Sequence, residues 1–560
     1  MLEEQPLKST KTHGKKILVL DLFSGIWPHT MLVAKMIGQL DPSIFDVRFL
    51  SCGELFPRFC TVRESRKRRV PEEGITSRLD CHDCKFSARH VGKFISKKKL
   101  GDTPTDFLSS YASNSTRELA EEVRARVSLN PLDLEFQLHG VPIVRHALYE
   151  TLIKYKKLDV QLNDSEIDYF QAILQNCILT VLSGREYLLR NGDLTAILIH
   201  SPEYGPNNSF AELAKQKGIS VYSVRGSSNL SEMESSAMIW RWDYRTETPP
   251  HLLSWPGWEN VSISNADRLR LEGHKEELST GKSPFVYSSP FNSKATALST
   301  MTKLGVQGGS KTILLSLSST DEIVAARTIN RGVAVFYPGT VFEDQFQWVS
   351  ETIEWVKKRP DLRLIVRLHP RDLPNKRDSV LSEQHAKWMG LLATLPTNVV
   401  LNHPDQKVSF QEVCFVSDVV VTGWSSTAIE AMLLGKPVVT YDESLPGFPK
   451  DIHLTGRSKE EYFKNLEASL FNAPSQSHVE VANRWLTHFL VRGSIQLSGG
   501  LFANLRIKGP VVIRKIFSGL DRYTPYIWRP LELWITFRQS IEVNRINRLL
   551  QDLLPNVYVK

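Results

Sequence analysis

The most informative part of the chain is Val419-Val420-Val421-Thr422-Gly423-Trp424-Ser425-Ser426-Thr427-Ala428-Ile429-Glu430-Ala431-Met432-Leu433-Leu434-Gly435-Lys436-Pro437-Val438-Val439. Its opening run of β-branched residues predicts a strand, and Gly423 permits a tight turn after it. Ser425 or Ser426 can cap the helix that follows, and the unpaired backbone N–H groups of such a helix start attract phosphate. Glu430 comes about one turn into this helix, where a carboxylate can accept hydrogen bonds from ribose hydroxyls. The stretch predicts a β-α-β unit with a phosphate-binding turn, and an ordinary capped unit without a ligand is the alternative.

A second segment, residues 362–371, predicts a buried strand that runs into a His-Pro corner between two arginines. In an open α/β sheet, ligands collect at the carboxyl ends of the strands, and this corner is such an end. Arg367 and Arg371 can each bind phosphate through two hydrogen bonds. His369 can donate a hydrogen bond to phosphate or protonate a leaving group. A turn histidine held by the proline is the alternative.

In this order, the two segments resemble the His-Pro and Ser-Ser motifs in the C-terminal half of the capsule polysaccharide biosynthesis glycosyltransferases. Relatives by the same motifs are the bacterial sialyl- and polysialyltransferases, the Kdo transferases of capsule assembly and, more distantly, the CDP-glycerol glycerophosphotransferases. The segment Tyr337–Phe346 and the helix predicted after it are similar to the part that precedes the His-Pro strand in these proteins. The match is specific over about residues 312–449 and weak before them.

The resemblance implies an α/β protein with the GT-B fold, in which two Rossmann-like domains face a cleft. By the family's pattern, His369, Ser425 and Ser426 would hold the phosphates of a donor nucleotide. Thr427 lies in the same helix start, and Ser318 follows a strand predicted for residues 312–317, so its hydroxyl would border the donor site. The resemblance therefore implies a nucleotide-sugar donor, with CMP, UDP and GDP left open.

The length of the chain predicts two domains and an appendage, because 560 residues are too many for one hydrophobic core. The contents of 41% hydrophobic and 23% charged residues are those of a globular protein. We expect an N-terminal acceptor domain over residues 1–275, a linker over 276–309, a donor domain over 310–475 and a helical, basic and aromatic tail over 476–560.

Alternating strand and helix patterns make the first domain Rossmann-like. Strands are predicted at residues 15–21, 45–50, 194–199 and 219–224, with helical patterns between them. Ser24, Gly25 and His29 do not form a dinucleotide fingerprint, so we expect them to be loop residues that border the cleft.

Two carboxylates are candidates for the catalytic base, because an inverting transfer needs a carboxylate or histidine near the acceptor hydroxyl. Asp21 and Glu203 both follow predicted strands of the first domain, and a solvated loop carboxylate is the alternative for each. The Asp/Glu-rich motif that carries the base in sialyltransferases has no clear copy here, which leaves the base and the stereochemical course open. No Asp-x-Asp motif stands in a setting suited to donor binding. We therefore expect residues 425–427, His369 and the arginines to meet the phosphate charge without an obligatory metal.

Four of the six cysteines cluster in the sequence, namely Cys52, Cys60, Cys81 and Cys84. A Cys-x-x-Cys pair with two further thiols can close a structural zinc site, which would tie a basic insertion at about residues 52–100 to the first domain. An iron–sulfur centre and free buried thiols are the alternatives.

The net charge of +8 indicates an acidic partner or surface. An anionic membrane face, or an acidic lipid-linked or polysaccharide acceptor, explains the basic clusters better than nucleic acid, because no nucleic-acid-binding motif accompanies them. A solvated basic face is the alternative. The tail from residue 501 mixes aromatic and basic side chains, as interfacial helices do, and packing of this tail on the first domain is an equal alternative.

No run approaches the roughly twenty apolar residues of a transmembrane helix, and the N-terminus lacks a signal-peptide pattern. We therefore expect a cytoplasmic protein, peripheral on the inner face of the plasma membrane. The sequence predicts a GT-B glycosyltransferase that moves a sugar from a nucleotide-activated donor to a capsular or other cell-surface polysaccharide or glycolipid. A CDP-polyol phosphotransferase of surface polymer synthesis and a non-catalytic GT-B-like glycan-binding scaffold are the alternatives.

Overall fold

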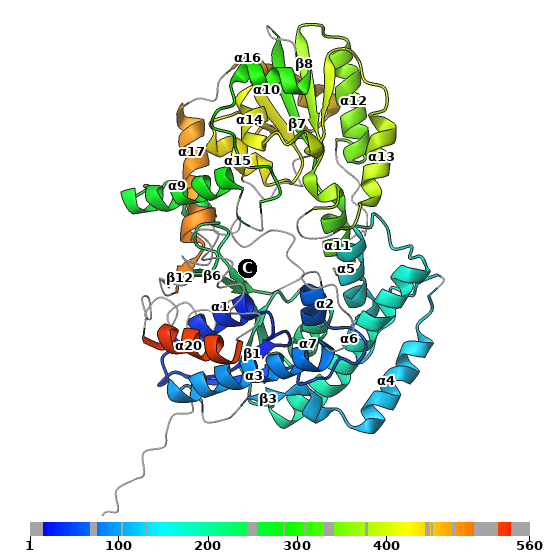
Figure 1. Cartoon of the computed structure of the whole chain (residues 1–560), viewed down its shortest axis with the longest axis vertical. Helices are drawn as coiled ribbons and strands as arrows, with labels where there is room; N and C mark the ends of the chain where they lie inside the picture. Colours follow the sequence, from blue (N-terminus) through cyan, green and yellow to red (C-terminus); the bar gives the residue numbers. More distant parts are fainter. Residues whose placement is uncertain are drawn as a thin grey trace, which may run out of the picture.

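Two β-sheets, each built around parallel strands and covered by helices, make up this computed structural model (Figure 1). It describes residues 15–67, 76–101, 105–129, 131–242, 255–281, 283, 286–306, 310–329, 341–375, 379–442, 449, 452–472, 476–497 and 525–538. The described part of the predicted segment Tyr337–Phe346 begins at residue 341.

The first sheet has the order β12-β6-β5-β4-β1-β2-β3. Its parallel strands are β1 (Lys15–Asp21), β2 (Phe45–Ser51), β3 (Asp106–Phe107), β4 (Ala196–His200) and β5 (Ser220–Gly226). β6 (Ser236–Arg241) pairs antiparallel with β5 and with β12 (Ile495–Gln496). Leu18 and Leu20 pack into one hydrophobic core, whereas Ile17 and Val19 pack into another. Both faces of this sheet are therefore buried, as an apolar run without alternation predicts.

The second sheet is wholly parallel and has the order β11-β10-β7-β8-β9. Its strands are β7 (Lys311–Ser316), β8 (Leu362–Arg367), β9 (Val399–Asn402), β10 (Val419–Thr422) and β11 (Val438–Thr440). Here too, Ile313 and Leu315 face one core and Leu314 the other. The predicted α/β fold with two Rossmann-like domains, the GT-B arrangement, is confirmed.

Helices connect and cover these strands. In the first domain they are α1 (Trp27–Ile37), α2 (Thr61–Lys67), α3 (Thr76–Lys97), α4 (Asn114–Arg126), α5 (Ile143–Tyr155), α6 (Asp164–Arg190) and α7 (Gly205–Gln216). α9 (Asn265–Thr280) follows, and the second domain has α10 (Ala297–Leu304), α11 (Thr320–Ile329), α12 (Gln345–Lys357), α13 (Glu383–Leu391), α14 (Phe410–Phe415), α15 (Thr427–Leu433) and α16 (Lys459–Phe471). The described end of the chain has α17 (Gln476–Thr487), a π-helical turn (His488–Arg492) and α20 (Pro525–Arg538).

Sheet order creates one topological switch point in each domain, since β1 lies between β2 and β4, and β7 lies between β8 and β10. Connections from these neighbouring strands leave in opposite directions, which opens a crevice at their carboxyl ends. The predicted phosphate-binding turn follows β10, and the His-Pro corner follows β8. Both therefore reach the crevice of the second sheet.

The C-terminal tail returns to the first domain. β12 extends the first sheet, and α20 packs against α1 and α3 (Figure 1). α20, the described part of the tail beyond residue 501, thus packs on the N-terminal domain. Among the described helices, none has the length and apolar character needed to cross a bilayer.

The two segments expected as an insertion and as a linker both contain helices. The segment expected as an insertion, about residues 52–100, contains α3, which is the crossover helix between the paired strands β2 and β3. The segment expected as a linker, residues 276–309, contains the end of α9 and the whole of α10, which packs against α14 and β9. Polar composition suggested loops there because the apolar face of α10 is short.

The returning C-terminal segment is one connection between the domains. A second connection, here called the second joint, is made by α5 and α11. α11 follows β7 in the second domain but packs against α5, and its residues Val324 and Ala325 belong to the core of the first domain. Lys156, at the end of α5, is fully buried and its Nζ donates hydrogen bonds to the carbonyl oxygens of Arg371 (2.6 Å), Val380 (2.6 Å) and Leu373 (3.3 Å). The domains are therefore held together at two separate places.

Candidate functional site

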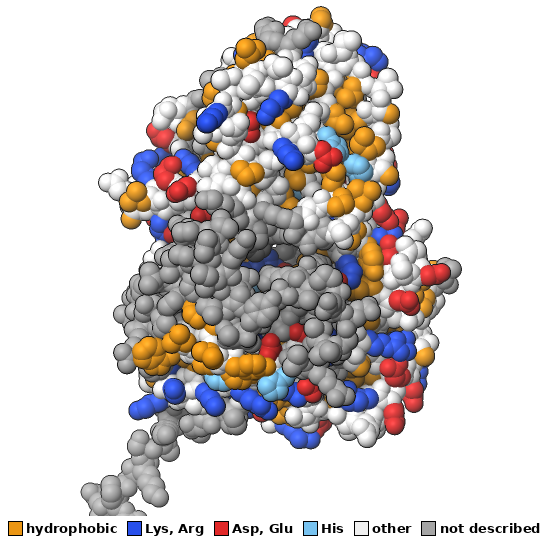
Figure 2. Space-filling model, viewed as in Figure 1, with side chains coloured by type: hydrophobic (Ala, Val, Ile, Leu, Met, Phe, Trp, Pro, Cys, Tyr) orange, Lys and Arg blue, Asp and Glu red, His pale blue; other side chains and the backbone are white. Residues whose placement is uncertain are grey.

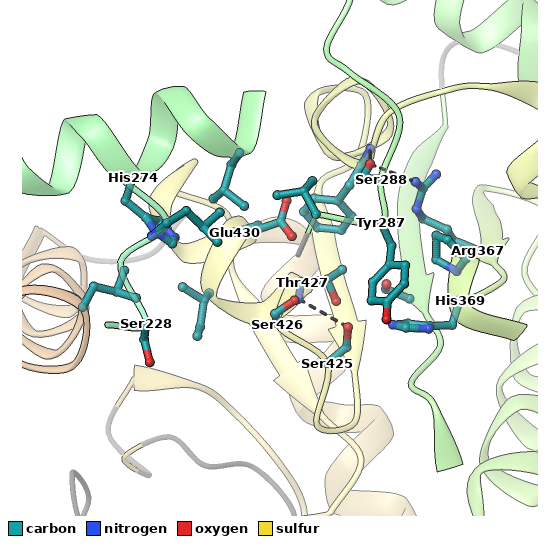
Figure 3. Close-up of a pocket in the computed structure, with 18 of the residues that line it drawn as sticks. Ser228, His274, Tyr287, Ser288, Arg367, His369, Ser425, Ser426, Thr427 and Glu430 are labelled. Atoms are coloured by element: carbon teal, nitrogen blue, oxygen red, sulfur yellow. Dashed lines mark hydrogen bonds between the residues drawn. The ribbon is translucent and has the colours of Figure 1, made fainter. Parts of the chain in front are cut away.

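A cavity of about 320 Å³ lies between the domains, where β7, β8 and β10 end (Figure 3). The first domain contributes the segment after β5, including Ser227 and Ser228. The second domain contributes the two predicted motifs, and the segment before β7 contributes Tyr287 and Ser288. The structure thus brings together, at one wall, six of the eight residues predicted to hold or border the donor: Arg367, His369, Ser425, Ser426, Thr427 and Glu430.

The turn between β10 and α15 presents three hydroxyls. Ser425 Oγ accepts a hydrogen bond from the backbone N–H of Thr427 (3.4 Å), whereas Ser426 is exposed and makes no capping bond through its side chain. Thr427 Oγ1 is buried and has no hydrogen-bond partner among the described residues. A buried hydroxyl without a partner is costly, so this atom indicates a place for a polar ligand group.

His369 faces the cavity with one ring nitrogen already engaged. Its Nδ1 accepts a hydrogen bond from the backbone N–H of Arg371 (3.3 Å), so in the neutral ring the proton is on Nε2. Burial, with the positive charges of Arg371, Arg367 and Lys156, lowers the pKa of His369 to about 3. His369 is therefore a neutral imidazole that can donate one hydrogen bond from Nε2.

Arg367 and Glu430 place opposite charges in the same wall. Arg367 is buried and donates hydrogen bonds to Asn402 Oδ1, to the carbonyl of Val408 (3.1 Å) and to Ser288 Oγ (3.4 Å) (Figure 3). Burial lowers the pKa of Arg367 to about 10, which leaves it positively charged at neutral pH. Burial raises the pKa of Glu430 to about 7, although Arg367 acts in the opposite direction. Glu430 therefore exchanges its proton near neutral pH.

Two other predicted binding residues lie outside the cavity wall. Arg371 is buried and points to the second joint, where Nη2 and Nε bind Asp321 Oδ2 at 2.7 and 3.1 Å. Ser318 is fully buried, and its Oγ accepts a hydrogen bond from the backbone N–H of Trp424 (3.2 Å). Both residues therefore hold the motifs in place without lining the cavity. Arg371 holds the His-Pro corner, and Ser318 holds the turn after β10.

The two candidate bases lie at strand ends of the first sheet, as predicted. Asp21 ends β1 and is buried, and its carboxylate accepts hydrogen bonds from Thr30 Oγ1 (2.7 Å) and the backbone N–H of Phe23 (3.2 Å). Burial raises the pKa of Asp21. Glu203 follows β4 and forms an ion pair with Arg225, and its Oε2 is buried without a hydrogen-bond partner among the described residues. Glu203 therefore has an oxygen left for a further contact.

The sequence did not predict that His29 and His200 lie together at this edge. His29, after β1, stacks on His200, at the end of β4, with 4.0 Å between the ring centroids. His29 is exposed, yet the surrounding protein lowers its pKa to about 4 by desolvation. Only the adjacency of β1 and β4 brings the two rings together, and no spacing along the chain signals it.

The four clustered cysteines occupy one region around α2 and α3. Cys52, Cys60 and Cys84 are buried, and Cys81 Sγ accepts a hydrogen bond from Arg63 Nη2 (3.1 Å). Burial raises the pKa of Cys52 to about 12, and it also raises the pKa of Cys60, which favours thiols over thiolates. In the described parts of the chain, no group of three or more His, Cys, Asp or Glu side chains converges as metal ligands. The zinc site stays a prediction without a ligand set.

Comparisons with known proteins give weak likenesses. No family model matches the chain, and no curated protein matches it. A beta Kdo 2,4 transferase, KpsC of Thermosulfurimonas dismutans, is similar in structure, with 13% identity over 52% of this chain and 79% of that chain and a TM-score of 0.31. A putative UDP-N-acetylglucosamine 2-epimerase of Listeria monocytogenes is 14% identical over 86% of this chain and 94% of its own, with a TM-score of 0.28. Likenesses of this size carry no argument about reaction or substrate.

Proposed function

We propose that this protein is a glycosyltransferase that moves a sugar from a nucleotide-activated donor to a cell-surface polysaccharide or glycolipid. One observation carries the proposal. At the switch point of the second sheet, one cavity is lined by the neutral His369, the buried guanidinium of Arg367 and the hydroxyl of Thr427, which has no hydrogen-bond partner among the described residues. Hydrogen-bond donors and one fixed positive charge in a partly enclosed site suit a phosphate-bearing ligand.

In this proposal, the chain's own groups meet the charge of the leaving phosphate. The acceptor oxygen forms a bond to the anomeric carbon, the bond from that carbon to the phosphate oxygen breaks, and its electron pair leaves with the nucleotide. His369 Nε2–H, Thr427 Oγ1 and the hydroxyls of Ser425 and Ser426 would donate hydrogen bonds to that oxygen and its neighbours. Arg367 would add a positive charge from the same wall. The proposal needs no obligatory metal.

The acceptor side of the proposal is the edge where β1, β4 and β5 end. A general base there would take the acceptor's hydroxyl proton, and Glu203 and Asp21 remain the proposed carboxylates. Glu203 is favoured because Oε2 lacks a partner among the described residues, whereas two groups already donate to Asp21. His29 lies at the same edge, but a pKa lowered to about 4 makes it a poor base near neutral pH. A position in the cytoplasm, at the inner face of the plasma membrane, belongs to the same proposal.

Phosphorus NMR of donor turnover tests the reaction. The protein is incubated with CMP-, UDP- and GDP-sugars or with CDP-glycerol, together with a cell-envelope glycolipid extract as acceptor. We expect one sugar nucleotide to disappear, its free nucleotide to accumulate, and no phosphorus to enter the product. Consumption of CDP-glycerol with release of CMP and a new phosphodiester signal would replace the proposal by polyol-phosphate transfer. No turnover of any donor would favour the non-catalytic scaffold.

Glu430 makes nucleotide binding depend on pH. Its pKa of about 7 means that the empty site holds the carboxyl about half protonated at pH 7. Ribose hydroxyls that donate to the carboxylate would favour its ionised form, so binding would release a proton. We expect affinity to fall as pH decreases below 7, by up to about tenfold per pH unit, and to level off above pH 7. Calorimetry at pH 7 in two buffers of different ionisation enthalpy measures the proton released.

The matched variant for this prediction is Glu430→Gln, which keeps the shape and the acceptor oxygen but cannot titrate. Its nucleotide affinity should vary less with pH between about 5 and 8 than that of the wild type, and the remaining dependence should be that of the nucleotide phosphate, whose second pKa is about 6. Equal proton release in the wild type and in the variant would rule out Glu430 as the titrating group.

A further inference from the structure

We propose that the outer face of α20, together with the adjacent basic edge of α3, docks on an anionic lipid membrane. The inference is independent of the proposed transferase activity. One face of α20 is buried against the first domain, and its exposed face also carries apolar side chains. Ile527, Leu531 and Trp534 are 73%, 43% and 50% exposed, and Tyr526 beside them is 42% exposed. Their spacing of four and three residues places the first three on one stripe of the helix.

Specific contacts hold α20 in this orientation. Arg529 Nη1 donates a hydrogen bond to Ser87 Oγ (2.6 Å), and its guanidinium lies over the ring of Trp27 at 5.2 Å. Trp27 Nε1 in turn donates to Glu532 Oε2 (2.7 Å). Arg529 and Glu532 are 1% and 5% exposed. Because polar groups fix the inner face, the outer stripe is presented as a surface of the folded domain.

The edge of α3 next to this stripe is basic. Tyr526 contacts His82 through a hydrogen bond of 3.0 Å between its hydroxyl and Nδ1, and it packs edge-on against Phe86. Lys93 and Lys97 follow Phe86 by seven and eleven residues, which places them on the same side of α3, and both are exposed. Figure 2 shows hydrophobic side chains gathered over α20 and Lys and Arg side chains along the neighbouring edge. Apolar and positive groups therefore share one surface.

This combination fits a bilayer surface whose headgroups are anionic. Trp and Tyr rings favour the interface between headgroups and acyl chains, where Ile and Leu can enter the apolar layer. Lysines beside them meet the negative surface potential of anionic lipids. A hydrophobic protein partner would explain the apolar stripe but not the lysines at its edge, and the net charge of +8 repels a basic partner. The occupant we infer is an anionic lipid surface.

Vesicle sedimentation with the full chain tests the inference. The probes are vesicles of phosphatidylcholine alone and of phosphatidylcholine mixed with phosphatidylglycerol, at low and high salt. We expect the protein to sediment with the anionic vesicles, more weakly at high salt, and hardly at all with phosphatidylcholine alone. The double variants Ile527→Ser/Trp534→Ser and Lys93→Glu/Lys97→Glu should each reduce the partition coefficient by about tenfold or more.

A matched control removes two exposed apolar side chains elsewhere. Leu269 and Leu298 are 74% and 76% exposed and lie on α9 and α10, so Leu269→Ser/Leu298→Ser should sediment as the wild type does. The inference is overturned if the wild type does not sediment with anionic vesicles or sediments equally with neutral ones. It is also overturned if the control variant loses as much vesicle binding as the α20 variant. Denaturation midpoints of the same preparations, followed by circular dichroism, should be unchanged, which shows that the variants fold without relying on the transferase site.

Discussion

Replacing Asp321 by alanine should destabilise the protein by about 3–5 kcal/mol, because the buried guanidinium of Arg371 loses its buried counter-ion and keeps only the exposed carboxylate of Glu322, 3.5 Å from Nε. The Arg371 and Asp321 side chains are 7% and 0% exposed, and Arg371 Nη2 lies 2.7 Å from Asp321 Oδ2. Asp321 also accepts a hydrogen bond from Ser319 Oγ (2.5 Å). Chemical denaturation followed by circular dichroism measures the loss as a lower midpoint.

The control for this prediction is an exposed ion pair. Lys357 and Glu354 on α12 are 3.1 Å apart and both 55% exposed, so Glu354→Ala should cost no more than about 0.5 kcal/mol. Equal denaturation midpoints for Asp321→Ala and Glu354→Ala would mean that the Arg371–Asp321 pair does not stabilise the joint between the domains.

Replacing Lys156 by methionine should have an effect of similar size, about 3 kcal/mol or more. Methionine fills the space of the aliphatic stem but cannot donate to the three carbonyl oxygens that Lys156 Nζ binds, and each carbonyl left buried without a donor costs about 1–3 kcal/mol. Two of these oxygens belong to Arg371 and Leu373, which follow His369 by two and four residues. We therefore expect weaker nucleotide binding as well as a lower denaturation midpoint.

An exposed lysine provides the comparison. Lys464 on α16 is exposed, so Lys464→Met should change neither stability nor nucleotide binding measurably. If Lys156→Met unfolds at the wild-type midpoint and binds nucleotide as the wild type does, then the buried lysine does not position the His-Pro corner.

Local patterns sufficed to predict the strands that end at the cavity and the two motifs in its wall. The valines before Gly423 and the apolar run before His369 both predict buried strands of an open α/β sheet. The carboxyl ends of such parallel strands meet at one edge of the sheet. The structure has β8 and β10 on either side of β7, which places His369 and Ser425 in the same cavity. Here the placement of the two motifs followed from the strand ends alone.

Side-chain direction could not be read in the same way. The 3₁₀ turn Pro370–Asp372 turns Arg371 away from the cavity and toward Asp321, although its position in the motif resembles that of Arg367. The stacking of His29 on His200 depends on which strands are neighbours, a property of the whole sheet. The burial of Lys156 depends on the docking of α5 on the second domain. Contacts between distant segments decide all three.

Calorimetric titration with CMP, CDP, UDP, GDP and ADP tests the central claim, that the cavity between the domains binds the donor nucleotide. The wild type should bind one of them selectively, and His369→Ala and Thr427→Val should each weaken that binding by about 1–3 kcal/mol, or roughly 5- to 150-fold. Thr302→Val is the control, since Thr302 is exposed and its hydroxyl binds only the carbonyl of Leu298 on α10 among the described contacts. This variant should bind as the wild type does. Binding of no nucleotide, or unchanged affinity in both cavity variants, would contradict the account.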